Sequence, residues 1–245
     1  MAKRDGWRAR RRIGVIALLI ALYLPLHAAW RLFGRRSPWP ICFLRAAGRA
    51  AGIDVRSVGT PVGRDVLLVA NHLSWLDILI LAGASGARFV AKDDVARWPL
   101  LGFLAALNRT VYVARGRRAE VRAQAEQMRS ALADGQPVAL FAEGTTGDGI
   151  ALLPFRASLL AALSPPLPRV VMQPVAIDYG AAAQLLAWRD TGVGEEMMRV
   201  LALPGRRSAV IRFLAPIDPA AAGDRKALAM QAQTRIADAL AGGRS

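Results

Sequence analysis

From Val66 onward, short apolar runs alternate with longer segments of helical periodicity. The short runs are rich in Val, Leu and Phe, as strands buried on both faces of a sheet usually are. We expect strands at 66–70, 88–91, 110–114, 138–142, 170–177 and 209–214. We expect helices at 75–84, 99–107, 119–133, 155–163 and 220–241. This alternation predicts an α/β fold in which a mostly parallel central sheet is flanked by helices.

A basic and apolar segment precedes this part of the chain. Residues 13–30 contain no Asp, Glu, Lys or Arg, and a run of 18 residues is close to the shortest helix that crosses a bilayer. A second, shorter apolar stretch follows at 41–53. We therefore expect residues 1–55 to form a membrane-anchoring segment, folded as a helical hairpin. We expect residues 56–245 to form the α/β domain.

The sequence leaves the membrane arrangement open. The hairpin can lie in one leaflet, or the first helix can cross as a single anchor. Both flanks are basic, so the excess of cytoplasmic positive charge gives no orientation. A signal peptide is a competing interpretation, because Ala28 and Ala29 follow an apolar middle, but Trp30 and Arg31 come directly after them.

The charge is concentrated at this end of the chain. Residues 1–36 hold nine Lys or Arg and one Asp, which is a net charge of +8 out of +15 for the whole protein. Basic residues that flank one apolar segment predict attraction to anionic lipid head groups. A nucleic-acid partner is not expected, since that would place basic residues across a folded face.

Few residues can perform metal or imidazole chemistry. The chain has one cysteine, Cys42, and two histidines, so an internal disulfide and a cysteine-based zinc cluster are excluded. His27 lies in the apolar run. Any imidazole chemistry in a polar site therefore falls to His72.

His72 and Asp77 lie between a predicted strand and the helix that follows it. One interpretation is purely structural: Ser74 and Asp77 form a pair that resembles a capping box, and His72 is an ordinary loop residue. The other is catalytic. Five positions apart on one helix, two side chains diverge by about 140°, so His72 has to lie in the loop and Asp77 in the first turn. The carboxylate can then orient the imidazole, which leaves the second ring nitrogen as a general base.

A glycine-rich block, Phe141-Ala-Glu-Gly-Thr-Thr-Gly-Asp-Gly149, follows the predicted strand 138–142. It falls at the carboxyl edge of the sheet, where α/β folds bind ligands. We expect amides at Gly144, Gly147 and Gly149 to form an anion-binding nest. The alternative is a plain polar turn. No P-loop lysine follows, so nucleotide hydrolysis is not supported.

Arg115 ends the predicted strand 110–114 and should lie at the same edge. A guanidinium there can hold a phosphate through two hydrogen bonds. The neighbouring Arg117 and Arg118 are better explained as solvated charges beside the next helix.

Together, these blocks resemble the glycerolipid acyltransferase family, typified by bacterial 1-acylglycerol-3-phosphate acyltransferase. Asn71-His72-Leu-Ser-Trp-Leu-Asp77 matches its NHxxxxD signature. The order and spacing agree over about residues 65–180. The other matching blocks are Phe89-Val-Ala-Lys92 with Trp98-Pro99, Gly102 and Arg109-Thr-Val-Tyr-Val-Ala-Arg115, then Phe141-Ala-Glu143-Gly144-Thr145, and Gln173-Pro174-Val175-Ala176-Ile177.

The resemblance implies transfer of a fatty acyl group from acyl-CoA or acyl carrier protein to the free hydroxyl of a lysophospholipid, with no cofactor and no metal. His72 would be the base and Asp77 its orienting partner. The thioester would be attacked directly, because no G-x-S-x-G nucleophile elbow occurs. The expected substrate contacts are Asn71, Lys92, Arg115, Glu143, Gly144, Thr145, Thr146 and Arg156.

The chain departs from the family at one position, where Thr146 replaces the usual arginine after EGT. This variant looks like the branch that includes lyso-ornithine-lipid acyltransferases. Arg156 could supply the missing charge.

The resemblance favours 1-acyl-sn-glycerol-3-phosphate as acceptor, giving phosphatidic acid, with lyso-ornithine lipid or another lysolipid as the alternative. It places the protein at a bacterial inner membrane with its site facing the cytoplasm. The competing interpretation from another class is a basic membrane-binding protein that is not an enzyme.

Overall fold

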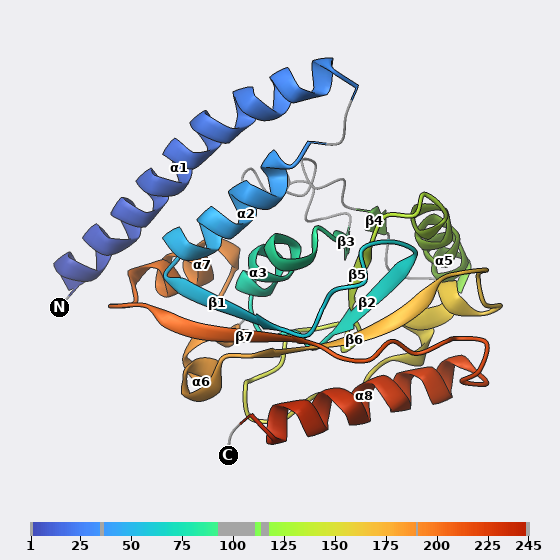
Figure 1. Ribbon diagram of the computed structural model, residues 1–245. Helices are drawn as coiled ribbons and strands as arrows, with labels where there is room; N and C mark the ends of the chain where they lie inside the picture. The colour runs from blue at the N-terminus through green and yellow to red at the C-terminus, as the bar shows by residue number, and fades with distance from the viewer. Residues whose placement is uncertain (1, 35–36, 93–110, 114–117, 190, 244–245) are drawn as a thin grey trace.

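The computed structural model describes residues 2–34, 37–92, 111–113, 118–189 and 191–243. One seven-stranded sheet with the order β1-β7-β6-β2-β5-β3-β4 forms its centre (Figure 1). The strands are β1 (Ile53–Val58), β2 (Val66–Ala70), β3 (Arg88–Lys92), β4 (Val111–Val113), β5 (Val138–Phe141), β6 (Val171–Asp178) and β7 (Arg207–Phe213). Every neighbouring pair is parallel except β6 and β7. The predicted α/β fold with a mostly parallel sheet is confirmed.

Helices lie on both faces of this sheet. They are α1 (Ala2–Leu32), α2 (Trp39–Ala50), α3 (Leu76–Ser85), α5 (Arg118–Ala133), α6 (Ala183–Leu186), α7 (Val193–Ala202) and α8 (Arg225–Ala241), with the short 3-10 helices η2 (Ala157–Leu163) and η3 (Gly180–Ala182). The helix expected at 99–107 lies outside the described residues. The helix expected at 155–163 is the tighter η2.

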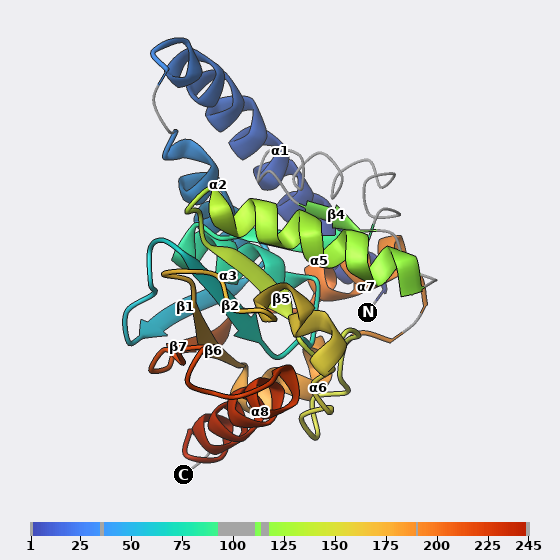
Figure 2. The same ribbon diagram turned by 90° about the vertical axis from the view of Figure 1, so that its right-hand side faces the viewer.

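The two faces of the sheet carry separate apolar cores. All five residues of β2 are buried, and successive side chains point to opposite faces. Leu68 belongs to the core between the sheet and the helices α2, α3 and α7. Leu67 and Val69 belong to the core between the sheet and the helices α5, η2 and α8. Figures 1 and 2 show α8 beneath the sheet and α1 to α3 above it. The loop after β2 is therefore anchored in a strand that is packed on both sides.

The sequence did not predict β1 or α7. In β1 only Ile53 is buried, so this edge strand carries polar residues and has no apolar run. It begins inside the segment 1–55 that we assigned to the anchor. The last helix also begins later than expected, at Arg225, because the Asp224 carboxylate accepts hydrogen bonds from the amides of Lys226 and Ala227.

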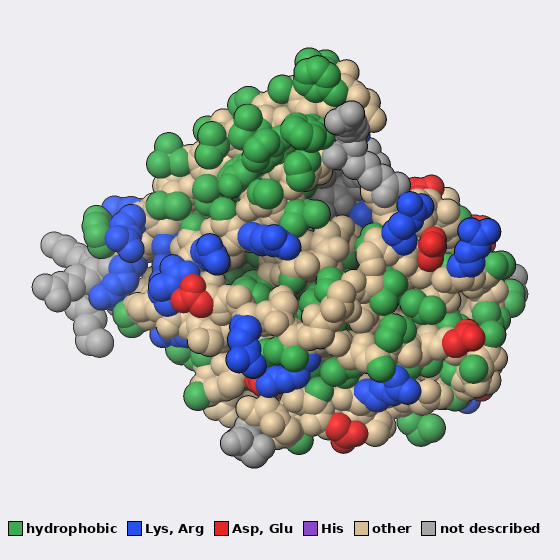
Figure 3. Space-filling view, viewed as in Figure 1, with side chains coloured by type: hydrophobic (Ala, Val, Ile, Leu, Met, Phe, Trp, Pro, Cys, Tyr) green, Lys and Arg blue, Asp and Glu red, His purple; other side chains and the backbone are tan. Residues whose placement is uncertain are grey.

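The N-terminal segment forms two helices. Within α1, Gly6–Leu32 is long and apolar enough to cross a membrane: it has 27 residues and a mean hydropathy of 2.0 in its most apolar window. Tyr23 and Trp30 of α1 contact Trp39 of α2, with ring centroids 5.9 and 6.2 Å apart. In Figure 3, hydrophobic side chains gather along α1, and Lys and Arg gather near its N-terminal end.

The basic end of α1 is built into the α/β domain. Arg12 donates hydrogen bonds to the carbonyls of Leu201 (3.2 Å) and Gly205 (2.6 Å). Gly52 makes room for this guanidinium, since a Cβ there would lie 2.5 Å from it. Ala9, one turn earlier, is fully buried. Burial, and then the nearby Arg207, lower the pKa of Arg12.

Candidate active site

The candidate site lies where three adjacent strands end. β6, β2 and β5 are parallel neighbours, and the segments that follow them carry Tyr179, His72 and Glu143 respectively. The carboxyl ends of parallel strands are the usual ligand-binding edge of an α/β sheet. The NHxxxxD segment and the glycine-rich block that begins at Phe141 therefore meet at the carboxyl edge of the sheet, as expected from the sequence.

His72 and Asp77 form the predicted pair. The Nδ1 atom of His72 lies 2.8 Å from Oδ2 of Asp77. His72 is in the loop after β2, and Asp77 is the second residue of α3. The Asp77 side chain is fully buried, whereas that of His72 keeps 17% of its surface exposed. A carboxylate only accepts hydrogen bonds, so Nδ1 carries the proton and the lone pair is on Nε2.

The Asp77 carboxylate also organises the loop around it. Its Oδ2 atom accepts hydrogen bonds from the amides of Leu73 (2.6 Å) and Ser74 (2.8 Å). The second of these is half of a capping box. The other half is weak, because Trp75 takes the N-cap position and Ser74 Oγ accepts only a 3.4 Å bond from Leu76. The structural and catalytic interpretations of Asp77 are therefore compatible.

The backbone of this loop is fixed from several sides. The His72 amide donates to Oε1 of Glu143 at 2.7 Å, and the His72 carbonyl accepts from the Gly147 amide at 2.8 Å. The Asn71 side chain donates to and accepts from the backbone of Ile177, at 2.9 and 2.8 Å. These bonds set the position of the imidazole before any substrate binds.

Glu143 and the glycine-rich block hydrogen-bond to the backbone around His72. The two Glu143 oxygens accept the amides of His72 and Leu153, at 2.7 and 3.0 Å. Burial raises the pKa of Glu143 to about 7. The predicted nest is wrong for Gly144 and Gly147, because their amides donate to the carbonyls of Phe141 and His72. Gly144 itself has a positive φ of 70°, which glycine adopts without strain.

Arg156 lies beside this block, as its proposed compensating role requires. Its amide donates to the Ala142 carbonyl at 2.8 Å. Its side chain runs across Gly144, where a Cβ would lie 3.1 Å from Arg156 Cδ. Thr145 is exposed and Thr146 is half-buried on the same turn.

The remaining predicted contacts are only partly visible. Lys92 ends β3, and its backbone pairs with β4, but its side chain lies outside the description. Arg115 lies outside the described residues altogether. The amide of Asn71 is occupied by Ile177, so its direct contact with substrate stays a prediction.

Two residues of the site were not predicted. Phe141 stacks on the His72 ring, with centroids 3.9 Å apart and an angle of 7° between the planes. Tyr179 donates its hydroxyl to Oδ1 of Asp77 at 2.6 Å. In the sequence, only their positions next to the matching blocks point to them. Phe141 is the first residue of the EGT block, and Tyr179 follows shortly after the block that ends at Ile177.

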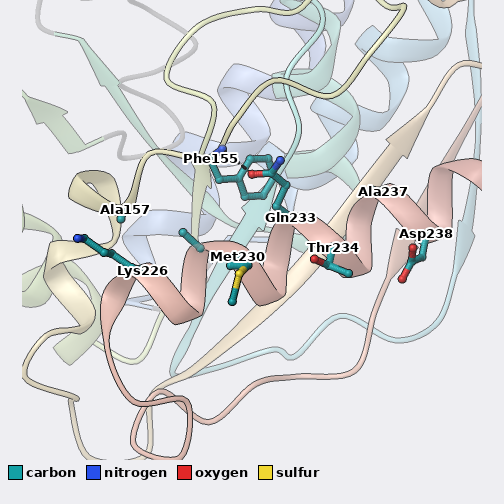
Figure 4. A pocket seen from close by; sticks show the side chains of 9 residues that line it. Phe155, Ala157, Lys226, Met230, Gln233, Thr234, Ala237 and Asp238 are labelled. Carbon is teal, nitrogen blue, oxygen red and sulfur yellow. Dashed lines mark hydrogen bonds between the residues drawn. The ribbon is translucent and has the colours of Figure 1, made fainter.

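Two hollows in the described part of the chain differ in size and in place. A small cavity of about 50 Å³ is lined by Asn71, His72, Glu143 and Tyr179 among others. A groove of about 460 Å³ lies along α8, where Figure 4 shows Gln233 beside Phe155 and Met230 between Gln233 and Lys226. Among the described residues that line this groove, none is a predicted site residue. We therefore take the surroundings of His72, and not the larger hollow, as the candidate site.

A histidine–carboxylate pair at the carboxyl edge of an α/β sheet, in a chain that also has a helix long and apolar enough to cross a membrane, is the arrangement expected of an α/β enzyme with a lipid substrate. The match to known proteins narrows this class. The family model described as "Acyltransferase" matches residues 53–178, and the chain belongs to this acyltransferase family.

Relatives cover most of the chain. It is 35% identical to the lyso-ornithine lipid O-acyltransferase of Brucella abortus over 91% of both chains. It is 33% identical to that of Pseudomonas aeruginosa, over 96% of this chain and 93% of the relative. A 1-acyl-sn-glycerol-3-phosphate acyltransferase of Neisseria gonorrhoeae is 30% identical over 74% of this chain and 73% of its own.

A solved structure has the same fold. The 1-acyl-sn-glycerophosphate acyltransferase PlsC of Thermotoga maritima superposes with a TM-score of 0.75. The two chains are 19% identical, and the match covers 100% of this chain and 98% of the other.

Proposed function

We propose that this acyltransferase moves a fatty acyl group from a thioester donor, acyl-CoA or acyl carrier protein, to the free hydroxyl of lyso-ornithine lipid, with His72 as general base. The observation that carries the proposal is the 2.8 Å contact between Nδ1 of His72 and buried Asp77. It orients the ring and leaves Nε2 for the hydroxyl proton.

The chemistry needs no covalent intermediate on the protein. Nε2 of His72 takes the proton of the acceptor hydroxyl as its oxygen bonds to the thioester carbonyl carbon. The tetrahedral intermediate then collapses, the C–S bond breaks, and the imidazolium returns the proton to the departing thiolate. Asp77 stabilises the imidazolium between these steps, because its buried negative charge lies against the charged ring.

The acceptor is argued from the relatives and from one residue. Three relatives that each match over more than nine-tenths of this chain are named lyso-ornithine lipid O-acyltransferases. Thr146 stands where the resembling phosphate-handling family has arginine. An ornithine head group carries amino and carboxyl groups and no phosphate, so the loss of that arginine costs it less.

The second candidate acceptor is 1-acyl-sn-glycerol-3-phosphate. Arg156 favours it, since its side chain crosses Gly144 and can supply a charge near a phosphate. The relative from Neisseria also carries this activity in its name.

We further propose that α1 lies within one leaflet. Arg12 ties the basic end of α1 to the α/β domain. Trp30, near the other end, contacts Trp39, the first residue of α2. The 12 residues of α2 span about 18 Å and lead directly into β1. A bilayer core is about 30 Å thick, so this hairpin is too short to return a crossing helix to the domain.

A panel assay tests the proposed reaction. The purified full-length protein, in mixed micelles, is given labelled acyl-CoA or acyl carrier protein together with lyso-ornithine lipid, lysophosphatidic acid or lysophosphatidylethanolamine. Selective acylation of lyso-ornithine lipid is expected. Selective formation of phosphatidic acid would establish the second candidate. No product from any lysolipid, with the protein folded, would contradict both.

A further inference from the structure

Tyr179 comes directly after β6 and reaches back to the catalytic pair. Its Oη atom lies 2.6 Å from Oδ1 of Asp77, which is 102 residues earlier in the chain. Tyr179 is 4% exposed and Asp77 is fully buried. The hydroxyl must be the donor, because an ionised carboxylate has no proton to give.

The two oxygens of Asp77 have different partners. Oδ2 accepts from three donors: Nδ1 of His72 and the amides of Leu73 and Ser74. Among the residues that the structure describes, Oδ1 accepts from the Tyr179 hydroxyl. The two backbone amides hold Oδ2, and the Tyr179 hydroxyl holds Oδ1, so Tyr179 is the side-chain donor that fixes the end of the carboxylate turned away from the imidazole.

We propose that Tyr179 is a positioning residue of the acyl-transfer reaction, which fixes the Asp77 carboxylate so that Oδ2 holds the productive His72 tautomer. This proposal rests on the proposed function of His72 as the base. It assigns Tyr179 no contact with either substrate.

The hydroxyl is suited to this task throughout the working pH range. Burial, and then the neighbouring Asp77 charge, raise the pKa of Tyr179 well above its usual value. The phenol therefore stays protonated and stays a donor. A buried carboxylate oxygen that lost this bond would keep its charge without solvent to replace the donor, which is costly.

Tyr179→Phe removes the oxygen and keeps the ring. We expect kcat to fall by about 10- to 100-fold, which corresponds to the loss of one hydrogen bond to a charged group. KM for the acyl donor and for the acceptor should stay within about twofold, because Tyr179 contacts neither substrate and its loss does not weaken their binding. The acid limb of the pH–rate profile should move to higher pH, since a carboxylate without this donor holds a proton more strongly, on itself or on its partner ring.

Two controls separate positioning from plain stability. Tyr23→Phe removes a phenol from the α1–α2 contact and should leave kcat and the pH profile unchanged. In an Asp77→Asn background, Tyr179→Phe should cost little further activity, because both changes act on one interaction. Additive losses in this double-mutant cycle would overturn the proposal.

A readout independent of turnover is also accessible, because the chain has only two histidines. With ¹⁵N-labelled histidine, His72 is identified by its absence in His72→Ala. We expect the Nδ1–H tautomer in the wild type and a mixture in Tyr179→Phe. If the tautomer, kcat and pH profile are unchanged while only Tm falls, Tyr179 is structural and the proposal is wrong. If His72→Ala retains turnover, the proposed function fails instead.

Discussion

The imidazole of His72 and the phenyl ring of Phe141 lie face to face, 3.9 Å apart and within 7° of parallel. Phe141 is the last residue of β5, so the ring that packs against the imidazole is held by the sheet. Phe89 of β3 stacks behind it at 5.3 Å. The face of an aromatic ring attracts a cation. The stack therefore favours the imidazolium that the proposed mechanism forms at His72.

The first prediction concerns this stack. Phe141→Leu keeps an apolar side chain and removes the aromatic face. We expect kcat to fall by about tenfold, because a cation–π interaction in a partly buried site is worth roughly 1 to 2 kcal/mol. Steady-state kinetics at saturating acceptor measure the change. Phe213→Leu, a buried core position on β7, is the control and should lower Tm without lowering kcat. Equal activity losses in both variants would contradict a specific role for the stack.

The second prediction concerns the base itself. His72→Ala should lower kcat by about a thousandfold or more, because general-base catalysis and the orienting network are lost together. Folding should be retained, since the ring is partly exposed and makes one hydrogen bond to Asp77. Circular dichroism and Tm verify the fold. His27→Ala, in the apolar part of α1, is the matched control and should retain turnover.

The third prediction is a dependence of stability on pH. Burial raises the pKa of Glu143 from 4.5 to about 7. Between these values the folded state binds more protons than the unfolded state, so the free energy of unfolding decreases as pH rises through this window. The full contribution, lost above pH 7, is on the order of 3 kcal/mol.

Thermal unfolding from about pH 5 to 8 tests this sign. Glu143→Gln cannot titrate and resembles the protonated form, so its stability should be flatter over the same range. It should also be less active above pH 7, where the wild-type carboxylate accepts both the His72 and Leu153 amides. A wild-type protein that becomes more stable from pH 5 to 7 relative to this variant would contradict the assignment.

The fourth prediction separates the two acceptors. If a phosphate is bound, Arg156→Ala should raise KM for lysophosphatidic acid by about 10-fold or more, as the loss of a charge-assisted hydrogen bond does. KM for lyso-ornithine lipid should change less. Arg225→Ala, an exposed position at the start of α8, is the charge-matched control. An unchanged KM for both acceptors would remove Arg156 from head-group recognition.

The sequence predicted the sheet best where a strand is buried on both faces. Val66–Ala70 is apolar at every position and was located to the residue. β1 was not found, because five of its six residues are exposed and its pairing with β7 comes from backbone bonds that any side chain permits. The pattern of apolar residues in a sequence reveals a strand only where its side chains are buried, and few side chains of an edge strand are buried.

The site was predictable in part for the same reason. The spacing of His72 and Asp77 determines their contact locally, within one loop and one helical turn. The contacts of Asp77 with Tyr179 and of His72 with Phe141 join segments 102 and 69 residues apart, so they depend on strand order. The nest failed because the amides of Gly144 and Gly147 had backbone carbonyls within reach, which residue type alone does not reveal.

The last prediction concerns the membrane. If α1 lies in one leaflet, Phe33 at the end of the hairpin stays on the side of the α/β domain. In a Cys42→Ala background, Phe33→Cys should not react with a membrane-impermeant maleimide in intact spheroplasts. Ala220→Cys, exposed in the loop after β7, is the control for the domain side and should react only in inverted vesicles. Reaction of Phe33→Cys from the periplasmic face would show that α1 crosses the bilayer. It would also require that the bonds of Arg12 to Leu201 and Gly205, or the contact of Trp30 with Trp39, break in the membrane.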